Sequence, residues 1–433
     1  MTDIEQALVE LSDLGLHRRM RLVSGPQGPR VLLDGQPVLL LCSNNYLGLA
    51  DHPRVREAAA DAAMRWGVGA GASRLVSGTM TVHRRLEERL ADFEATESCL
   101  LFGSGYLANL GVISALARRD EVVLSDRLNH ASIIDGCRLS GAQTFVYDHG
   151  DIEHLAWGLA QAGSRAALIV TDSVFSMDGD LAPLAEIVEL ARRHGVRVMV
   201  DEAHATGALG PGGRGAVAEA GLEGEVDVVV GTLGKALGSY GAYVCANATM
   251  TRYLVNCARS LIFSTALPPP AVAGALAALE LVVEQPRRVQ RLRANSDLLR
   301  EELTREGFDT TGSATQIIPL VVGDARLAMS LCEAALTRGV FAQAIRPPTV
   351  APGTSRLRLA VMASHTRGEL RGAAQALGQA ALEVGFRPAD GGPPAAAQEH
   401  ARGGDRSDVT EPTALPAGAD VDLVRVGRAA HAA

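Results

Sequence analysis

Lysine is nearly absent from this sequence, although it is normally among the commonest residues of proteins. Lysine and arginine together number 41 over 433 residues, and only one of them, Lys235, is a lysine. Arginine can replace lysine wherever only a surface charge is needed, but a guanidinium group cannot form a Schiff base. Two interpretations stay open: a compositional bias left Lys235 by chance, or Lys235 is needed as an amine.

Several other features are missing. No apolar stretch reaches the roughly 18 residues of a membrane span, and the polar, amphipathic start lacks the apolar run of a signal peptide. The net charge is −8 without a basic tract, which argues against nucleic acid as a partner. The six cysteines are scattered and form no CxxC pair, so neither a zinc site nor a disulfide framework is indicated. We therefore expect a cytoplasmic protein without a metal site.

Apolar runs of strand length alternate with helical patterns through the middle of the chain. The sequence predicts buried strands at 166–171, 196–200 and 226–231, and a helix at 184–194 that ends at Gly195. This alternation is typical of an α/β fold, in which a mainly parallel sheet is covered by helices on both faces. Ligands of such sheets bind at the carboxyl ends of the strands.

Breaks in the alternation predict the domain organisation. A triple proline at 268–270 precedes a long helix that reaches Glu284, and further strands are predicted at 316–322 and 356–361. The last part of the chain is rich in Gly, Ala, Pro and Asp, which is typical of disorder, and its short apolar run at 421–426 is not expected to pair. We predict an N-terminal helix and extended segment, a large domain, a smaller C-terminal α/β domain and a disordered tail, at residues 1–45, 46–266, 267–386 and 387–433.

Two ionisable residues follow two of the predicted strands. Asp201 ends the strand VRVMV, and Lys235 follows VDVVVGT within a glycine-rich turn. A lysine placed there can form an imine with pyridoxal phosphate (PLP), and an Asp201 carboxylate would keep the pyridine nitrogen of PLP protonated. Taken alone, Asp201 is better explained as a helix cap or a salt-bridge partner. Because both residues end strands at the same edge of one sheet, the cofactor interpretation is favoured.

Three weaker signals agree with the interpretation that this edge of the sheet binds a cofactor. The turn from Gly103 to Tyr106 precedes an apolar helical run, and a helix that begins on glycine presents free N–H groups to a phosphate. This turn is not a P-loop, because GKS or GKT does not follow. His130, in the loop after EVVLS, is placed to stack on a flat cofactor ring, and His204 to contact the phenolic oxygen of that ring. Taken alone, His130 is equally well explained as a hydrogen-bonded loop residue, and a lone loop histidine such as His204 is usually only a polar residue without a special role.

Seven motifs stand in order along the chain, and in them it resembles the α-oxoamine synthases, a family of PLP-dependent acyltransferases. They are SNNYLGL (43–49), GASRLVSG (71–78), LFGSGYLAN (101–109), DRLNHASIIDG (126–136), VFSMDGD (174–180), VDEAHATG (200–207) and GTLGKALG (231–238). The resemblance extends from about residue 15 to residue 386. It implies the PLP-dependent transferase fold of type I, like that of aspartate aminotransferase, with a large, mainly parallel domain and a smaller C-terminal α/β domain.

The resemblance also implies a role for each residue that matches a family motif. The catalytic residues would be Lys235, His130 and Asp201. The residues that bind the cofactor would be Lys235, Gly105, Tyr106, His130, Ser176, Asp201, His204, Thr232, Ser264 and Thr265. The residues that bind substrate would be Arg18, His130, Thr349 and Arg358.

Three of these implied roles go beyond simple contact with the cofactor. Arg358 would hold the carboxylate of an amino acid by a bidentate pair, which suits a planar guanidinium. Ser264 and Thr265 would reach the cofactor phosphate of a neighbouring subunit, which implies a homodimer with shared sites. Arg18 is our choice for the N-terminal contact with substrate, and Arg19 and Arg21 stay open as alternatives.

The segment IRPPTVAPGTSRLR (345–358) is most similar to the branch of this family that condenses L-alanine with a pimeloyl thioester. The resemblance therefore implies formation of 8-amino-7-oxononanoate, CoA and CO2 in biotin synthesis, with pimeloyl-CoA or a pimeloyl carrier protein as the acyl donor. The alternatives are a synthase that joins glycine to acetyl-CoA, a carrier-protein-dependent synthase of secondary metabolism, an aminotransferase and a non-catalytic PLP-binding protein.

Overall fold

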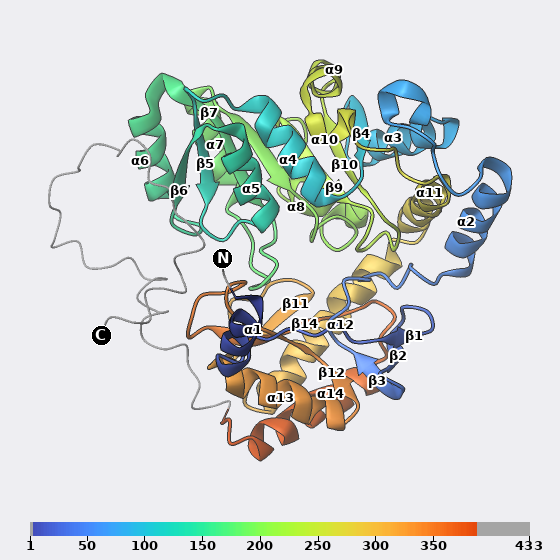
Figure 1. Cartoon of the computed structure of the whole chain (residues 1–433), viewed down its shortest axis with the longest axis vertical. Coiled ribbons are helices and arrows are strands. Elements are labelled where there is room, and N and C mark those ends of the chain that lie inside the picture. Colours follow the sequence, from blue (N-terminus) through green and yellow to red (C-terminus); the bar gives the residue numbers. More distant parts are fainter. Residues whose placement is uncertain (1–2, 388–433) are drawn as a thin grey trace, which may run out of the picture. The chain divides into compact units, whose positions relative to one another are not determined.

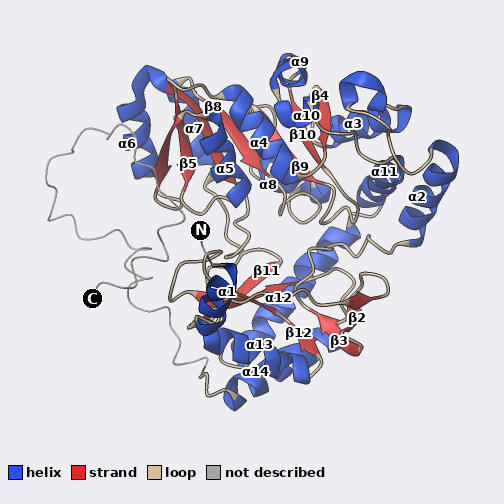
Figure 2. Cartoon of the chain, in the orientation of Figure 1, coloured by secondary structure: helices blue, strands red, loops and turns tan. Residues whose placement is uncertain are grey.

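The computed structural model describes residues 3–387 of the chain (Figure 1). The predicted tail lies, apart from Arg387, outside the described residues, and so does the run at 421–426. In the part of the chain that is described, helices and strands alternate as an α/β fold (Figure 2). No helix of this part is both long and apolar enough to cross a membrane.

The largest element is a seven-stranded sheet. From one edge to the other its strands are β4 (Ser98–Phe102), β10 (Ala242–Ala246), β9 (Val228–Thr232), β8 (Arg197–Asp201), β7 (Ala166–Asp172), β5 (Val122–Asp126) and β6 (Gln143–Tyr147). Strand β10 is antiparallel to both of its neighbours, and every other neighbouring pair is parallel. The three strands predicted at 166–171, 196–200 and 226–231 are thus confirmed as β7, β8 and β9.

Helices cover both faces of this sheet, because alternate residues of its strands enter two separate cores. Leu168 and Val170 pack with α4 (Gly105–Leu116), α5 (Ala131–Ser140), α9 (Ala248–Cys257) and α10 (Arg259–Ile262). Ile169 and Val198 belong to the other core, with α3 (Thr81–Phe93), α6 (Ile152–Ala162), α7 (Leu184–His194), α8 (Gly215–Glu219) and α11 (Pro269–Glu284). The helix predicted at 184–194 is confirmed as α7, and Gly195 ends it with a left-handed φ of 65°.

The C-terminal half carries a smaller antiparallel sheet in the order β11 (Ile317–Gly323), β14 (Ser355–Ala360) and β13 (Gln343–Ile345). Helices α12 (Arg287–Arg305), α13 (Ala325–Thr337) and α14 (Arg367–Glu383) pack around it. The strands predicted at 316–322 and 356–361 are confirmed as β11 and β14. The long helix predicted after the triple proline is α11, which packs against α2 (Pro53–Trp66) and α3.

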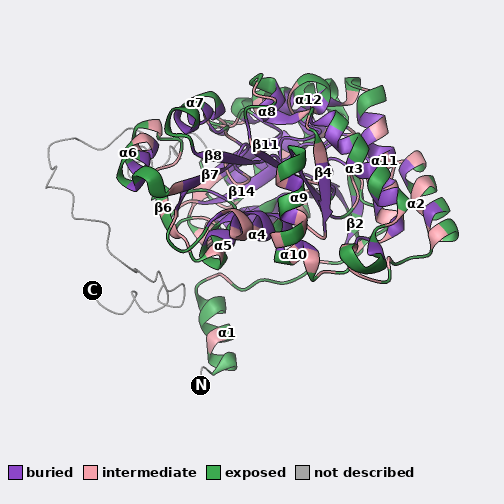
Figure 3. Ribbon diagram, turned by 90° about the horizontal axis from the view of Figure 1, so that it is seen from above, coloured by how far each residue is buried: buried purple, intermediate pink, exposed green. Residues whose placement is uncertain are grey.

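The N-terminal segment is more ordered than the extended chain that the sequence predicts. After α1 (Ile4–Asp13) it forms β1 (Val23–Ser24), β2 (Arg30–Leu33) and β3 (Gln36–Leu40), and β3 pairs in parallel with β12 (Val340–Phe341). Figure 3 shows the strands of the large sheet buried and α1 largely exposed, and no residue of α1 is buried. The described residues, 3–387, form one compact unit, so the predicted domain boundaries within them stay predictions.

Candidate active site

Acidic residues gather at the carboxyl ends of the central strands. Asp172 ends β7 and pairs in register with Asp201, which ends β8. The strands are apolar and buried from Ala167 to Val170 and from Val198 to Val200, and the two carboxylates lie at the edge where ligands of such sheets bind. Burial and the neighbouring Asp201 carboxylate raise the pKa of Asp172 well above its usual value.

Lys235 lies in a tight turn that follows β9 at the same edge. The backbone N–H of Gly238 donates to the Lys235 carbonyl at 2.9 Å, which closes the turn. Gly238 has a φ of 60°, and a Cβ built on it would lie 2.4 Å from the backbone nitrogen of Ala50. Glycine is therefore required at this position, because both the conformation and the close backbone contact exclude a side chain.

The amine of Lys235 begins a chain of hydrogen bonds through buried groups. Its Nζ lies 2.7 Å from Nε2 of His204, and Nδ1 of His204 lies 2.7 Å from the hydroxyl of Tyr46. Burial lowers the pKa of His204 well below its usual value, so the ring is neutral. With Nε2 accepting from Lys235, Nδ1 carries the proton and donates to Tyr46.

Arg358 reaches the same tyrosine from the small sheet. It lies on β14 with 6% of its surface exposed. Its Nη2 donates to the Tyr46 hydroxyl at 3.4 Å, its Nη1 to Oδ1 of Asn44 at 3.2 Å, and its Nε to the carbonyl of Ser176. The single lysine of the chain and a buried guanidinium are therefore joined through His204 and Tyr46, although they come from different sheets.

Asp201 is held by two donors. Its Oδ1 accepts from the backbone N–H of Ala203 at 2.8 Å, and its Oδ2 accepts from Nδ2 of Asn109 at 2.7 Å. Asn109 also donates to Ser132 at 2.8 Å, and only 1% of its surface is exposed. Asn109 is not among the residues predicted from the sequence. The signal that would have found it is a polar amide inside the apolar run of α4.

His130 connects this network to Asp172. It caps the N-terminus of α5, where its Nδ1 lies 2.7 Å from the hydroxyl of Ser132, and its backbone N–H donates to Asp172 at 2.7 Å. Desolvation lowers the pKa of His130, although the carboxylate of Asp201 opposes this effect. Ser132 thus holds the imidazole near Asp201, and Asp172 holds the backbone of His130.

The N-terminus of α4 forms another part of the site. Ser104 caps this 12-residue helix by accepting from the N–H of Leu107 at 3.2 Å. A Cβ built on Gly105 would meet no atom within 4 Å, so the space beside this first helical residue is open. The hydroxyl of Tyr106 donates to Asp135 on α5. Such a terminus is suited to a phosphate group.

Four of the predicted residues lie away from the groups around Lys235: Arg18, Thr349, Ser264 and Thr265. Arg18 donates to the carbonyl of Pro347 at 3.2 Å, two residues from Thr349, whereas Arg19 and Arg21 pair with Glu333. Ser264 and Thr265 follow α10, where Thr265 forms a bridge with Ser73. Within the described residues, none of these four hydrogen-bonds to the groups around Lys235.

Two further predicted residues, Ser176 and Thr232, adjoin the site. Ser176 presents its carbonyl to Arg358. Thr232 ends β9, and its hydroxyl donates to the carbonyl of Gly241 at 3.1 Å and accepts from the N–H of Gly234 at 3.2 Å. Thr232 therefore shapes the turn that carries Lys235. Residues 3–387 contain no group of three His, Cys, Asp or Glu side chains that could hold a metal ion.

The sequence pattern of the family described as aminotransferase class I and II matches residues 36–377. The chain belongs to this family. The matched residues include both the large sheet and β14, the strand that carries Arg358.

Individual proteins are similar over almost the whole described chain. The 8-amino-7-oxononanoate synthase of Geobacter sulfurreducens is 52% identical over 88% of this chain and 98% of its own. A structure of SPT with a PLP internal aldimine has a TM-score of 0.85 and 33% identity, and covers 89% of this chain and 98% of its own. The 8-amino-7-oxononanoate synthase of Francisella tularensis has a TM-score of 0.70 and 25% identity, over 81% and 99% of the two chains. These likenesses confirm the predicted type I fold.

The chemistry of the site fits PLP. An aldehyde needs an amine that is partly neutral, and burial lowers the pKa of Lys235 to about 8 against the opposing effects of Asp201 and Asp172. A pyridine nitrogen needs a buried carboxylate, which Asp201 supplies with 4% of its surface exposed. A phosphate needs N–H donors, which the start of α4 provides beside the open space at Gly105.

Proposed function

We propose that this protein is a PLP-dependent acyltransferase that condenses L-alanine with pimeloyl-CoA, or with a pimeloyl carrier protein, in biotin synthesis. The products are 8-amino-7-oxononanoate, CO2 and the free thiol. The observation that carries the proposal is the hydrogen-bonded path from Lys235 through His204 and Tyr46 to Arg358. The path has an amine at one end and a guanidinium at the other, which supports a site that binds both the amino group and the carboxylate of an amino acid. The 52% identity to a named 8-amino-7-oxononanoate synthase supports the choice of substrates.

Lys235, Asp201, His130 and the start of α4 would hold the cofactor. Bound PLP supplies an electron sink that makes the Cα–H bond of an attached amino acid acidic. The Lys235 amine removes the proton from Cα and returns a proton to the same carbon after CO2 has left. Because burial lowers its pKa to about 8, the Lys235 amine can be neutral before the first transfer and charged after it, close to physiological pH.

Arg358 would hold the carboxylate of alanine. A guanidinium has five N–H donors, and three of its N–H groups are directed at Ser176, Asn44 and Tyr46. One N–H remains on each terminal nitrogen, which is the arrangement that a bidentate pair with a carboxylate uses. Burial raises the pKa of Tyr46, so this residue stays a neutral hydrogen-bond partner beside the guanidinium.

The remaining cofactor and substrate contacts follow the family motifs. In our proposal His130 stacks on the ring and contacts substrate, and His204 contacts the phenolic oxygen. Further cofactor contacts come from Gly105, Tyr106, Ser176 and Thr232, and further substrate contacts from Arg18 and Thr349. Arg18 donates to the carbonyl of Pro347, two residues from Thr349, which is consistent with a shared substrate.

A homodimer in the cytoplasm is the proposed state of the protein. Ser264 and Thr265 would reach the cofactor phosphate of the second copy. Phe263 beside them is 70% exposed, and Val76, close in sequence to the Ser73 bridge partner of Thr265, is 79% exposed. Exposed apolar side chains of this size are typical of a surface that is covered in an assembly.

A thiol-release assay tests the proposed reaction. The protein is purified with PLP and mixed with pimeloyl-CoA or acetyl-CoA, each with alanine or glycine, and the product is identified by mass. We expect the fastest release with pimeloyl-CoA and alanine, with 8-amino-7-oxononanoate as the product. Preference for glycine and acetyl-CoA would overturn the substrates but keep the site, and amino transfer to a 2-oxo acid without thiol release would overturn the acyltransferase proposal.

A further inference from the structure

A small hairpin spans residues 173–182, between β7 and α7. Its base is closed by the bridge of Val174 with Leu181, and the N–H of Phe175 donates to the carbonyl of Asp180 at 3.1 Å. Near the tip the N–H of Gly179 returns to the carbonyl of Phe175 at 2.8 Å. The hairpin is therefore a defined backbone structure on the large-sheet side of the site.

The tip of this hairpin is docked on the small sheet. The Ser176 carbonyl accepts from Nε of Arg358, and the Gly179 carbonyl accepts from the hydroxyl of Thr315 at 3.0 Å. A Cβ on Gly179 would lie 2.2 Å from the carbonyl oxygen of Ile317, so the backbone of the hairpin touches β11 directly. The position of the hairpin therefore determines where the Ser176 carbonyl, the hydrogen-bond acceptor for Nε of Arg358, lies.

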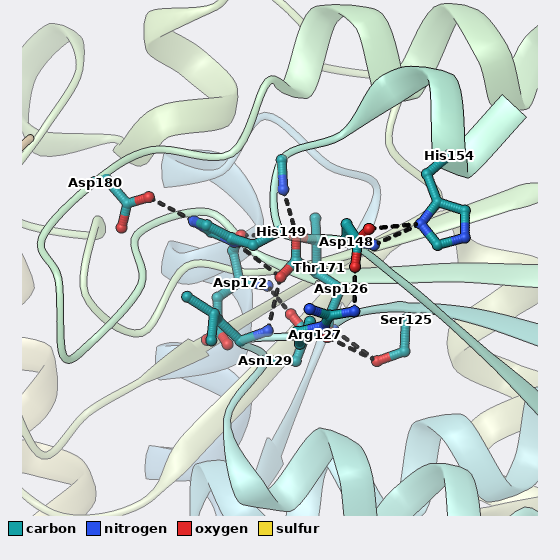
Figure 4. A network of polar contacts seen from close by, with 12 residues as sticks. Ser125, Asp126, Arg127, Asn129, Asp148, His149, His154, Thr171, Asp172 and Asp180 are labelled. Carbon is teal, nitrogen blue, oxygen red and sulfur yellow. Dashed lines mark hydrogen bonds and ion pairs between the residues drawn. The ribbon is translucent and has the colours of Figure 1, made fainter. Parts of the chain in front are cut away.

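His149 ties the other end of the hairpin to the large sheet (Figure 4). Its Nε2 lies 2.6 Å from Oδ2 of Asp180, and its Nδ1 lies 2.9 Å from Oδ1 of Asp126. Asp126 ends β5 and also accepts from the N–H groups of Leu128 and Gly150, so it is a rigid anchor. The ring of His149 packs edge-on against Phe175, at 4.3 Å between ring centroids.

The geometry requires a charged imidazole. Both ring nitrogens face carboxylate oxygens, and only an imidazolium can donate from both of them. Burial opposes the charge of His149, yet the hydrogen bonds to Asp126 and Asp180 outweigh it and raise the pKa to about 10. The other charged groups around this cluster are Arg127 and His154, which both pair with Asp148, the buried Asp172 that adjoins Asp126, and Asp178 on the hairpin, which pairs with Arg356 of β14.

We propose that His149 is a positioning residue for the amino-acid substrate. Its ion pair with Asp180 holds the hairpin, and the hairpin orients Arg358 through the Ser176 carbonyl. His149 itself touches neither substrate nor cofactor in this account. The inference rests on the proposed function, because it needs Arg358 to bind the carboxylate of the amino acid.

The experiment compares two histidine variants of the full-length, PLP-loaded protein. His149→Ala removes the ion pair with Asp180. His154→Ala is the matched control, since His154 is also a partly buried histidine of this network, 3.3 Å from Asp148, but does not contact the hairpin (Figure 4). The steady-state readouts are the KM for alanine, the KM for the acyl thioester and kcat. The structural readout, which needs no activity, is hydrogen exchange of the peptide over 173–182.

We expect His149→Ala to raise the KM for alanine about tenfold or more, the effect of weakening one charge-assisted hydrogen bond. The KM for the thioester and kcat should change less than about threefold, and exchange should accelerate at 173–182. His154→Ala should leave all four quantities unchanged. An unchanged KM for alanine in His149→Ala, or equal effects of both variants, would overturn the inference. If His149→Ala does not fold, Asp180→Asn makes the same test while keeping the side-chain shape.

A double variant separates this inference from the proposed function. Arg358→Lys by itself should raise the KM for alanine, and adding His149→Ala should then raise it by less than about twofold, because both act on one contact. Additive effects would show that His149 acts by another route. If Arg358→Lys leaves the KM for alanine unchanged, the assignment of Arg358 fails and the inference fails with it.

Discussion

Replacing Arg358 with lysine should weaken alanine binding without harming the acyl donor. The guanidinium makes three contacts to Ser176, Asn44 and Tyr46 and keeps one N–H on each terminal nitrogen for a carboxylate. A lysine ammonium has three donors at one point and no planar fork, so it cannot keep these contacts and bind a carboxylate by two bonds. The loss of one hydrogen bond to a charged group is worth about 1.5–3 kcal/mol. Since about 1.4 kcal/mol is a factor of ten, kcat/KM for alanine should fall by about 10-fold to 150-fold.

Steady-state kinetics with each substrate varied in turn measures this effect. The KM for the acyl thioester should stay within about twofold, because the change removes carboxylate binding alone. Arg214→Lys is the control, since Arg214 is also a partly buried arginine that donates to a backbone carbonyl, that of Phe93 at 2.9 Å. A fall in kcat/KM for alanine of less than about threefold would refute the assignment of Arg358, and so would an equal rise in both KM values.

Three further predictions concern the turn that carries Lys235, the carboxylate of Asp201, and the ion pairs of His149. Gly238→Ala should lower the free energy of unfolding by at least about 1–3 kcal/mol in urea titrations, because of the positive φ and the backbone contact. Gly234→Ala in the same turn, with nothing nearer than 3.6 Å, should have a smaller effect. Asp201→Asn should lower kcat by at least about tenfold, and a smaller loss would argue that Asp201 is not the partner of the ring nitrogen. The folded-state pKa of His149, about 10, lies above the usual 6.5, so its contribution to stability is complete below about pH 6.5 and is lost as the pH rises through about 10. The Tm of the wild type should therefore fall more steeply than that of His149→Ala between pH 8 and about 10.5, and parallel Tm curves would contradict this.

Features that depend on local pattern were predictable from the sequence. The apolar runs gave β7, β8 and β9, and the rule for parallel sheets then put Asp201 and Lys235 at one edge. Gly195 predicted the end of α7, because a left-handed residue there needs glycine. These predictions depend only on residues that are close to one another in the sequence.

Features that depend on distant partners were not predictable in this way. Tyr46 stood within a quoted motif, but its partners His204 and Arg358 lie 158 and 312 residues away in sequence. Asn109 meets Asp201 across 92 residues. The pairing of β3 with β12 joins segments that lie far apart in the sequence. Strand β12 has only two residues, which is too short to show an alternation of apolar and polar residues.

The most direct test of the central claim is where the cofactor is attached. The protein loaded with PLP is reduced with borohydride, digested and analysed by mass spectrometry. Because Lys235 is the only lysine in the sequence, our account predicts one PLP adduct, on the peptide that contains Lys235. The absence of an adduct, or an adduct only on the N-terminal amine, would contradict the account.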